Sequence, residues 1–329
     1  MHRRMRAVVI DEPGGPEVLQ IRDVPVPEPG PGQVRVRVRA FGINRADLLQ
    51  RRGLHPAPPD SPADIPGLEH AGEVDALGEG VDNVAVGDPV MGIVGGGAYA
   101  EYVLTPAAHA VPIPEGLSFA AAASIPEVFI TAHDALQRLR VTSREWVLVH
   151  AVGSGVGTAA LQLIAVRGAR CVGTSRTAAK LERAAALGME AGIDTTAQQL
   201  VPAMRKITGD GAHAAIDLLG GAMFPDTLDS LAYRGRLVLV GLTAGPRADV
   251  DLGVILRKRL RIEGTALRAR SIEEKTQIVA SFRNAILPLF AEGRLHAVLD
   301  RIFPFEEVAE AHVYMESNVG FGKVVVEIQ

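Results

Sequence analysis

The sequence predicts an α/β protein with two domains, one built on a doubly wound parallel sheet and the other on a partly open β-barrel. Short strands separated by Gly and Asp turns dominate the first third of the chain, whereas strands alternate with helices in the middle third. Such alternation is typical of βαβ units and hence of a parallel sheet. The length of 329 residues also exceeds what one hydrophobic core usually spans.

The first third is expected to supply the barrel strands. Val34, Val36 and Val38 alternate with arginines, which predicts a strand with one core face and one solvated arginine face. Further short strands are expected at residues 7–10, 72–76, 89–93 and 99–104. Residues 323–328, an apolar run after an expected helix over 275–290, predict a strand that rejoins this domain.

The middle third is expected to supply the parallel sheet. Buried-type apolar runs predict strands at residues 146–150, 170–174, 214–218, 236–242 and 260–263. Helical spacing of apolar residues predicts helices at 156–167 and 177–187 between them.

A glycine-rich turn follows the first of these strands and opens a helix. Residues 151–157 have the sequence AVGSGVG, with small residues that let a backbone approach a pyrophosphate closely. A helix N-terminus offers free N–H groups and a positive dipole end to that charge. We therefore expect a dinucleotide bound at Ser154, Gly155, Val156 and Gly157, although Ser154 stands where the standard motif has a glycine.

The end of the second strand indicates which dinucleotide is bound. NAD sites usually carry Asp or Glu here to accept hydrogen bonds from the ribose 2′-OH. This chain has Ser175 and Arg176 instead, followed by Lys180. A hydroxyl and two cations suit a 2′-phosphate, so NADPH is the expected cofactor. The alternative is that Arg176 and Lys180 are ordinary surface cations of a helix.

Composition excludes several classes of function. The net charge of −4 and the absence of a basic stripe argue against nucleic acid or an anionic membrane as partner. The one cysteine, Cys171, excludes an internal disulfide and a Cys-rich metal site. No run approaches the roughly 18 apolar residues of a membrane span, so we expect a cytoplasmic protein.

Motifs along the whole chain resemble those of the medium-chain dehydrogenase/reductase superfamily, in its zinc-free, zeta-crystallin-like quinone oxidoreductase branch. The segments that carry the resemblance are 14–19 (GGPEVL), 44–51 (NRADLLQR), 67–69 (GLE), 95–103 (GGGAYAEYV), 125–127 (IPE), the glycine turn and 320–323 (GFGK). The resemblance implies a GroES-like catalytic domain formed by both ends of the chain, with a Rossmann domain between them. The implied boundaries are 1–126, 127–267 and 268–329, and the implied assembly is a homodimer through the Rossmann domain.

Further site residues follow from the resemblance. It implies cofactor contacts from Thr131, Gly241, Leu242 and Lys323. Zinc-dependent relatives have a Cys where Asn44 stands and a His where Leu68 stands, so no metal site is expected.

Two residues are expected to act on the acceptor. Asn44 would face the nicotinamide and polarise the acceptor oxygen, unless it is a turn-forming residue. His55 replaces a Tyr of the branch and is the second catalytic candidate, unless it is structural. The expected reaction is NADPH-dependent reduction of a quinone or a related α,β-unsaturated carbonyl. The alternatives are an alkenal or enoyl-thioester reductase, and a cofactor-binding structural or RNA-associated protein.

Overall fold

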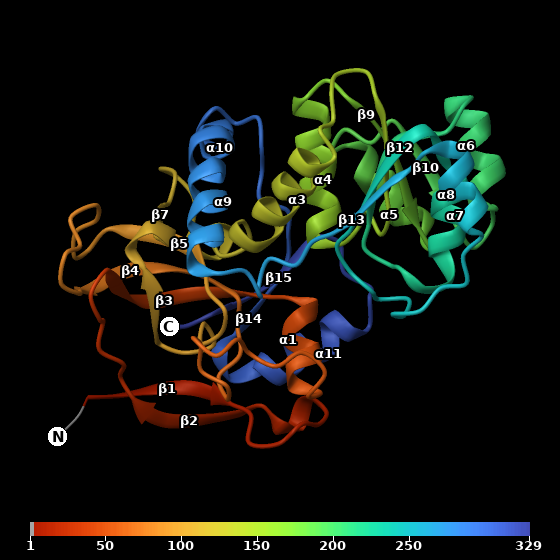
Figure 1. Cartoon of the computed structure of the whole chain (residues 1–329). Helices are drawn as coiled ribbons and strands as arrows, with labels where there is room; N and C mark the ends of the chain where they lie inside the picture. Colours follow the sequence, from red (N-terminus) through yellow and green to blue (C-terminus); the bar gives the residue numbers. More distant parts are fainter. Residues whose placement is uncertain (1–2) are drawn as a thin grey trace. The chain divides into compact units, whose positions relative to one another are not determined.

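The computed structural model describes residues 3–329, which form two compact units (Figure 1). The first unit combines the chain up to Ile130 with Leu267–Gln329, and the second is Thr131–Ala266. The sequence-based boundaries after residues 126 and 267 lie close to these divisions. The first division falls inside one continuous helix, α3 (Pro126–Arg138).

The first unit is built on antiparallel strands. β1 (Arg4–Val9) and β2 (Gln20–Pro25) form a two-stranded sheet of their own. The larger sheet has the order β14-β15-β3-β4-β5-β7, and β6 also pairs with β3, so the described strands form an open rather than a closed barrel. Its strands are β3 (Gln33–Ile43), β4 (Glu69–Leu77), β5 (Pro89–Ile93), β6 (Tyr102–Pro106), β7 (Val111–Pro112), β14 (Leu299–Pro304) and β15 (Lys323–Glu327).

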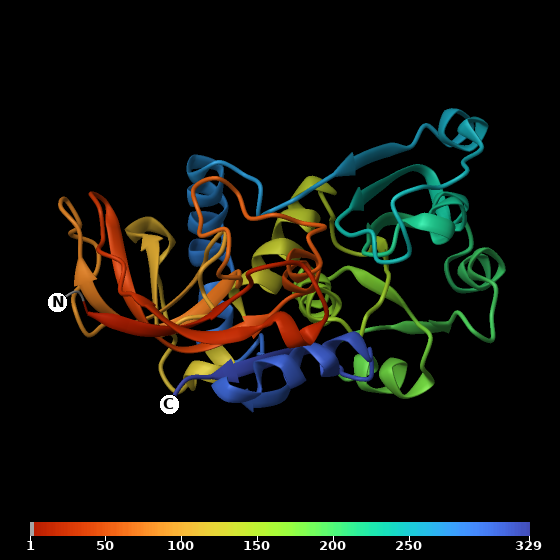
Figure 2. The same ribbon diagram turned by 90° about the horizontal axis from the view of Figure 1, so that it is seen from below.

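The C-terminal segment completes this unit. β15 pairs antiparallel with β3, which places the end of the chain beside a strand from its first third (Figure 2). This unit also holds the helices α1 (Arg45–Arg51), α2 (Phe119–Ala122), α9 (Ile272–Ala285), α10 (Leu287–Ala291) and α11 (Val308–Glu316). The expected strand at 323–328 is therefore confirmed as β15. The single helix expected over 275–290 is two helices, α9 and α10, with Pro288 in the first turn of the second.

Strand β3 departs from the expected alternation at one position. Val34, Val36 and Val38 are fully buried, as the pattern predicts. Arg37 is exposed, but Arg35 is buried, so the prediction of a solvated arginine face is wrong at this residue. The pairing of β3 with β4 shifts register between Arg35 and Val36. The buried guanidinium is compensated by carboxylates, Asp75 at 2.7 Å and Glu28 at 2.9 Å.

The second unit is a six-stranded parallel sheet with the order β10-β9-β8-β11-β12-β13. Counted along the chain this is 3-2-1-4-5-6, the order of the Rossmann fold, so the predicted fold class is confirmed. The strands are β8 (Trp146–Val149), β9 (Arg170–Ser175), β10 (Ala191–Asp194), β11 (Ala212–Asp217), β12 (Leu231–Leu239) and β13 (Arg261–Gly264). The helices are α4 (Gly155–Val166), α5 (Ala178–Ala185), α6 (Leu200–Thr208), α7 (Phe224–Asp229) and α8 (Leu252–Lys258).

The order of this sheet fixes where a ligand can bind. The strand order reverses between β8 and β11. In doubly wound sheets, ligands bind at the carboxyl ends of the strands beside such a reversal. Residues 147–149 of β8 are completely buried, as expected for a central strand covered on both faces. In the part of the chain that the structure describes, no helix is both long and apolar enough to cross a membrane.

Candidate functional site

The turn after β8 offers hydrogen-bond donors to an anion. Ser154 is the N-cap of α4, and its hydroxyl accepts the N–H of Gly157 at 3.1 Å. Within residues 3–329, the N–H groups of Gly155 and Val156 have no acceptor. A Cβ at position 157 would lie 2.6 Å from the carbonyl oxygen of Ala151, so the helix can pack this closely because the residue is glycine. The turn therefore fits a bound pyrophosphate.

Residues after β9 lie at the same edge of the parallel sheet. Ser175 ends β9, and its hydroxyl accepts the N–H of Thr177 at 3.1 Å. Arg176 is exposed and its guanidinium has no partner among the described residues. Lys180 lies in the first turn of α5 and is half-buried. This edge thus presents an exposed cation to a bound phosphate.

The remaining expected cofactor residues fall in both units. Gly241 and Leu242 follow β12, and the N–H of Gly241 donates to the carbonyl of Asp217, the last residue of β11. Thr131 lies in α3 and is buried. These three belong to the second unit, as do the residues after β8 and β9. Lys323 alone of the expected set lies in the first unit.

Lys323 is the centre of a buried polar cluster in the first unit. Its Nζ contacts three oxygens: the carbonyl of Ile43 at 2.7 Å, Asn44 Oδ1 at 2.8 Å and Glu69 Oε1 at 2.6 Å. Its side chain is 4% exposed and that of Glu69 is completely buried. An ammonium has three donors, and these contacts occupy all three. The lysine therefore neutralises Glu69 and fixes the Asn44 amide.

Asn44 is held on both sides of its amide. Oδ1 accepts from Lys323, and Nδ2 donates to Glu69 Oε1 at 2.9 Å. The other partner of Nδ2, the carbonyl of Gly42, is 3.4 Å away, which is long for an N–H···O bond. Asn44 therefore keeps one weakly used amide hydrogen with a fixed direction. It is also the N-cap of α1, as a turn-forming Asn would be.

Glu127 meets the same cluster from α3. Its backbone N–H donates to Glu69 Oε2 at 2.9 Å, so Asn44 and Glu127 bind the two oxygens of one carboxylate. The Glu127 side chain is half-buried. Desolvation, together with the neighbouring Glu69 carboxylate, raises the pKa of Glu127 to about 8. At neutral pH this carboxyl group therefore carries its proton.

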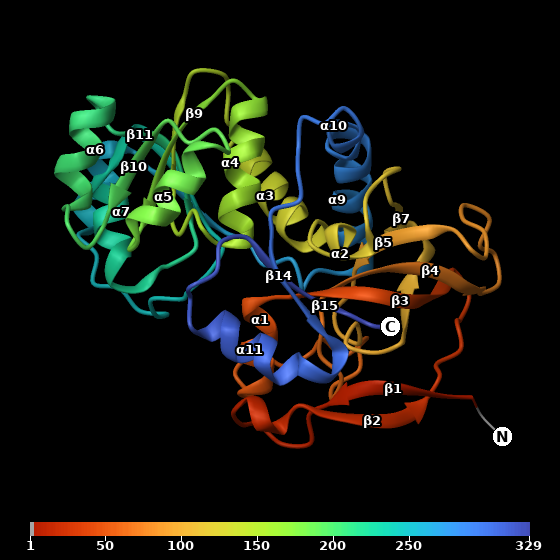
Figure 3. The same cartoon turned by 180° about the vertical axis from the view of Figure 1, so that it is seen from behind.

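The helices α1 and α11 lie near each other (Figure 3), and a second buried network joins them. Asp47 Oδ2 accepts the Asn44 N–H at 2.8 Å and the Tyr99 hydroxyl at 3.0 Å. The Tyr99 oxygen lies 3.1 Å from Nε2 of His312. Burial raises the pKa of Asp47 to about 6, while burial and the neighbouring Arg51 lower the pKa of His312 to about 3. His312 is therefore neutral, and Asp47 is a carboxylate at neutral pH.

His55, the other expected catalytic residue, is not part of either network. It is half-buried, and its backbone carbonyl accepts from Arg268 at 3.0 Å. Burial and the Arg268 charge lower the pKa of its imidazole. Arg268 also donates to Gln50 Oε1 and the carbonyl of Gly95, so it ties the loop of His55 to two other segments.

The sequence analysis named Glu69 and Glu127 only as parts of motifs that carry the resemblance. It did not predict their roles in this cluster. A signal was present: Glu69 directly follows the apolar residues 65–68, and a charge buried there requires a partner. The identity of that partner, Lys323, could not be read from the sequence because it lies 254 positions further along. Asp47, Tyr99 and His312 were likewise not recognised as one network.

The cluster does not fit a zinc ion. Leu68 carries no ligand atom, and the side chains of Asn44 and Glu69 both bind the ammonium of Lys323. His70 is buried and next to Glu69, but burial lowers its pKa to about 4 and neither ring nitrogen has a partner in residues 3–329. Among residues 3–329, no group of three or more His, Cys, Asp or Glu side chains is placed to hold a metal ion.

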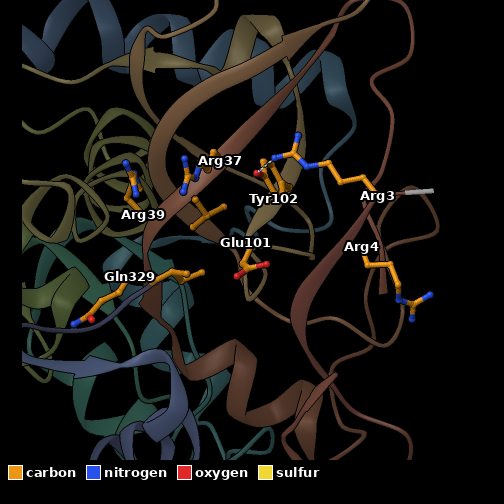
Figure 4. Close-up of a pocket in the computed structure, with 9 residues that line it drawn as sticks. Arg3, Arg4, Arg37, Arg39, Glu101, Tyr102 and Gln329 are labelled. Atoms are coloured by element: carbon orange, nitrogen blue, oxygen red, sulfur yellow. Dashed lines mark hydrogen bonds between the residues drawn. The ribbon is translucent and has the colours of Figure 1, made fainter. Parts of the chain in front are cut away.

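A cavity of about 170 Å³ lies elsewhere in the first unit, beside β1, β3 and the end of the chain (Figure 4). Its arginines are largely engaged: Arg3 donates to the Tyr102 hydroxyl, and Arg39 pairs with Glu73 at 3.0 Å. Glu101, also in the wall, pairs with Arg6 at 2.8 Å. None of the site residues expected from the sequence lines it, so this cavity is distinct from the polar cluster around Lys323.

Known protein families match both units. A family model described as "Alcohol dehydrogenase GroES-like domain" matches residues 30–115, and one described as "Zinc-binding dehydrogenase" matches residues 155–283. Quinone oxidoreductase-like protein 2 of Bos taurus is 30% identical over 88% of this chain and 83% of its own length. The synaptic vesicle membrane protein VAT-1 homolog of Homo sapiens is 31% identical over 87% of this chain and 77% of its own.

Solved structures give the same result. An NAD-dependent alcohol dehydrogenase superposes with a TM-score of 0.89 at 35% identity, covering 99% of this chain and all of the other. A quinone oxidoreductase of Pseudomonas syringae pv. tomato and a mycobacterial protein complexed with NADPH both give a TM-score of 0.88, at 29% and 30% identity, covering 98% of this chain and 99% of theirs. With the Rossmann sheet, the GroES-like unit and these relatives, the chain belongs to the medium-chain dehydrogenase/reductase superfamily of oxidoreductases, whose fold binds a nicotinamide cofactor.

Proposed function

We propose that this protein is a zinc-independent, NADPH-dependent reductase of quinones or related α,β-unsaturated carbonyls. The observation that carries the proposal is the cluster in which Lys323 holds Asn44 and Glu69. Zinc-dependent relatives have a metal ligand at the position of Asn44, and here an ammonium group is bound to this side chain instead. An acceptor oxygen must therefore be polarised by hydrogen-bond donors rather than by a metal ion.

The second unit supplies the binding site for the cofactor. The N–H groups of Gly155 and Val156 would bind the pyrophosphate, and the Ser175 hydroxyl and Arg176 the 2′-phosphate. Lys180, Thr131, Gly241 and Leu242 complete the proposed contacts. When bound, the nicotinamide supplies a hydride, which is the chemistry that defines the reaction.

The first unit supplies the groups that act on the acceptor. Lys323 and Glu69 fix the Asn44 amide, and its remaining hydrogen would be donated to the acceptor oxygen. A neutral amide stabilises oxyanion charge less than a metal ion does, so electron-poor acceptors such as quinones should be favoured over simple ketones. His55 remains a second candidate for contact with the acceptor. Lys323 acts in this proposal on Asn44, because its three donors are already used.

The function is tested by following NADPH oxidation with a panel of quinones, alkenals, enoyl-CoA esters, ketones and alcohols. Quinones are expected to be the best acceptors, and chelation by EDTA is expected to leave the rate unchanged. A preference for enoyl-CoA esters or alkenals would assign the enoyl-thioester or alkenal reductase activity instead. Activity that disappears with EDTA and returns with zinc would contradict the proposal.

The same assay tests the role of Asn44. Asn44→Ala is expected to lower quinone turnover by about ten- to a thousandfold, the scale of losing one oxyanion donor, with little change in NADPH affinity. The matched control is Asn83→Ala, which removes another amide of the first unit, one that donates to the carbonyl of Ala107 at 3.0 Å. Equal effects of the two substitutions would show that Asn44 has no special part in turnover.

A further inference from the structure

Two carboxyl groups and one ammonium share the polar cluster around Lys323. Glu69 and Glu127 are joined by a 2.9 Å hydrogen bond from the Glu127 N–H, and Lys323 lies 2.6 Å from Glu69. One cation neutralises one carboxylate. Because two neighbouring carboxylates repel each other in a poorly solvated site, the second carboxyl group is driven to keep its proton.

The hydrogen bonds decide which of the two carries the proton. Glu69 Oε1 accepts from Lys323 and Asn44, and its Oε2 accepts from the Glu127 N–H. Both oxygens of Glu69 therefore accept hydrogen bonds, and Lys323 supplies the opposite charge. The Glu127 side chain accepts no hydrogen bond from any residue between 3 and 329. Glu127 is thus the group that is left as a neutral acid.

Other charged groups near Glu127 shift its pKa, some upward and some downward. Asp47 adds to the repulsion from Glu69, whereas Lys323 and Arg268 favour the carboxylate. Lys275, on α9, also interacts with the Glu127 charge. The first turn of α3, where Glu127 lies, favours an anion as well. Desolvation is the largest effect and outweighs these cations, so the balance favours the protonated form.

Glu127 differs from the rest of the cluster in its exposure. Asn44, Glu69 and Lys323 are buried, whereas the Glu127 side chain is half-buried, so part of it is accessible to solvent. We propose that Glu127, as a neutral carboxylic acid, donates the proton that completes reduction of the acceptor. This inference rests on the proposed function and adds the proton donor that the reaction requires.

The step balances as follows. Hydride addition to the conjugated acceptor moves an electron pair onto its carbonyl oxygen, so NADPH is oxidised and the acceptor reduced. An O–H bond forms at that oxygen as the O–H bond of Glu127 breaks, which leaves the Glu127 carboxylate. Water returns the proton before the next turnover. A carboxylic acid held neutral by its surroundings can act as such a donor at neutral pH.

The protonation state can be measured without any acceptor. Infrared difference spectra of the wild-type protein, recorded across a pH titration, should show a protonated-carboxyl C=O band that disappears as pH rises through about 8. The band should be absent from Glu127→Gln and retained in Glu115→Gln, the same substitution at an exposed position. A wild-type spectrum at neutral pH without a band that depends on Glu127 would overturn the inference, whatever the acceptor.

Turnover provides the second readout. Quinone reduction by the wild type should slow as pH rises through about 8, since the donor must be protonated. Glu127→Gln should lower kcat by about a hundredfold or more and remove this pH dependence, with unchanged NADPH affinity. Glu115→Gln should behave as the wild type.

The outcomes separate this inference from the proposed function. A wild type that reduces quinones, with a Glu127→Gln variant of equal kcat and pH profile, overturns the donor role and leaves the proposed function intact. A wild type that reduces no quinone, enal or enoyl ester overturns both, even if the infrared band is present. A variant altered in stability but not in pH profile would show a purely structural role at the start of α3.

Discussion

Arg176 is the residue on which the choice of cofactor depends. Its guanidinium is exposed and has no partner among the described residues, so it can bind a 2′-phosphate without first breaking another contact. Arg176→Ala is expected to weaken NADPH binding by about ten- to a hundredfold, the scale of a charge-assisted hydrogen bond, and to leave NADH binding unchanged. Fluorescence titration with both nucleotides measures this.

The control for this substitution is Lys206→Ala, which removes an exposed cation from α6 in the same unit. It should change neither affinity. If the wild type binds NADH as tightly as NADPH, Ser175, Arg176 and Lys180 do not bind a 2′-phosphate. Arg176 is then an ordinary surface cation.

Features formed by residues close together in the sequence could be predicted, whereas contacts between residues far apart in the sequence could not. The turn at 151–157 was predictable because strand, glycines and helix follow one another within a few positions. The contact between Lys323 and Asn44 joins residues 279 positions apart. Sequence spacing carries no information on such a pair, so Lys323 was expected among the cofactor contacts, and its contacts with Ile43, Asn44 and Glu69 were not predicted.

At the scale of elements, the Tyr99 hydroxyl connects α1 to α11 through Asp47 and His312. Tyr99→Phe leaves both buried groups without this partner and should cost about 1–3 kcal/mol of stability. The cost should be larger above the pKa of Asp47, about 6, where the group is a carboxylate and loses a donor. Below that pH Asp47 is protonated and the cost should be smaller. Chemical denaturation on both sides of this pH measures the difference.

Tyr233→Phe is the matched control for this prediction. The Tyr233 side chain is exposed, and its hydroxyl accepts from Arg259 at 3.2 Å on the surface of the second unit. This substitution should change stability little at either pH. A Tyr99→Phe variant that matches it, or whose loss of stability does not depend on pH, would show that the Tyr99 hydroxyl does not stabilise the Asp47 carboxylate.

Element types followed from the sequence more reliably than element details. The hydrophobic periods predicted five of the six described strands of the parallel sheet and the return of β15, because burial enforces those periods, but they did not predict β10. The hydrophobic periods did not predict two details. These are the break between α9 and α10 and the burial of Arg35. Pro288 cannot supply a helical N–H, and Arg35 finds two carboxylates on other segments.

At the scale of the whole molecule, the edge of the Rossmann sheet is suited to a second copy of the chain. β13 pairs with β12 on one side and with no described strand on the other. Ile262 on β13 is exposed, as are Leu252 and Leu256 on α8, the helix just before it. An open edge flanked by apolar side chains is a template for strand pairing between molecules.

Pairing of two β13 strands about a two-fold axis at Ile262 would be antiparallel. Arg261 of one copy would then lie opposite Glu263 of the other, and the reverse pair would form at the same time. The two copies of Ile262 would meet at the axis. Charge and hydrophobicity are therefore both self-complementary at this edge, which supports the homodimer through the second unit that we expect.

Light scattering on a sizing column tests this assembly. The wild type is expected at twice the chain mass of 34.8 kDa. Ile262→Glu would place two carboxylates side by side at the axis and is expected to shift the protein to a single chain, while Val86→Glu, at an exposed apolar residue of the first unit, should leave the dimer intact. A monomeric wild type, or an Ile262→Glu variant that remains a dimer, would exclude β13 as the pairing edge, because an antiparallel interface centred on residue 262 cannot accommodate the two charges without a partner.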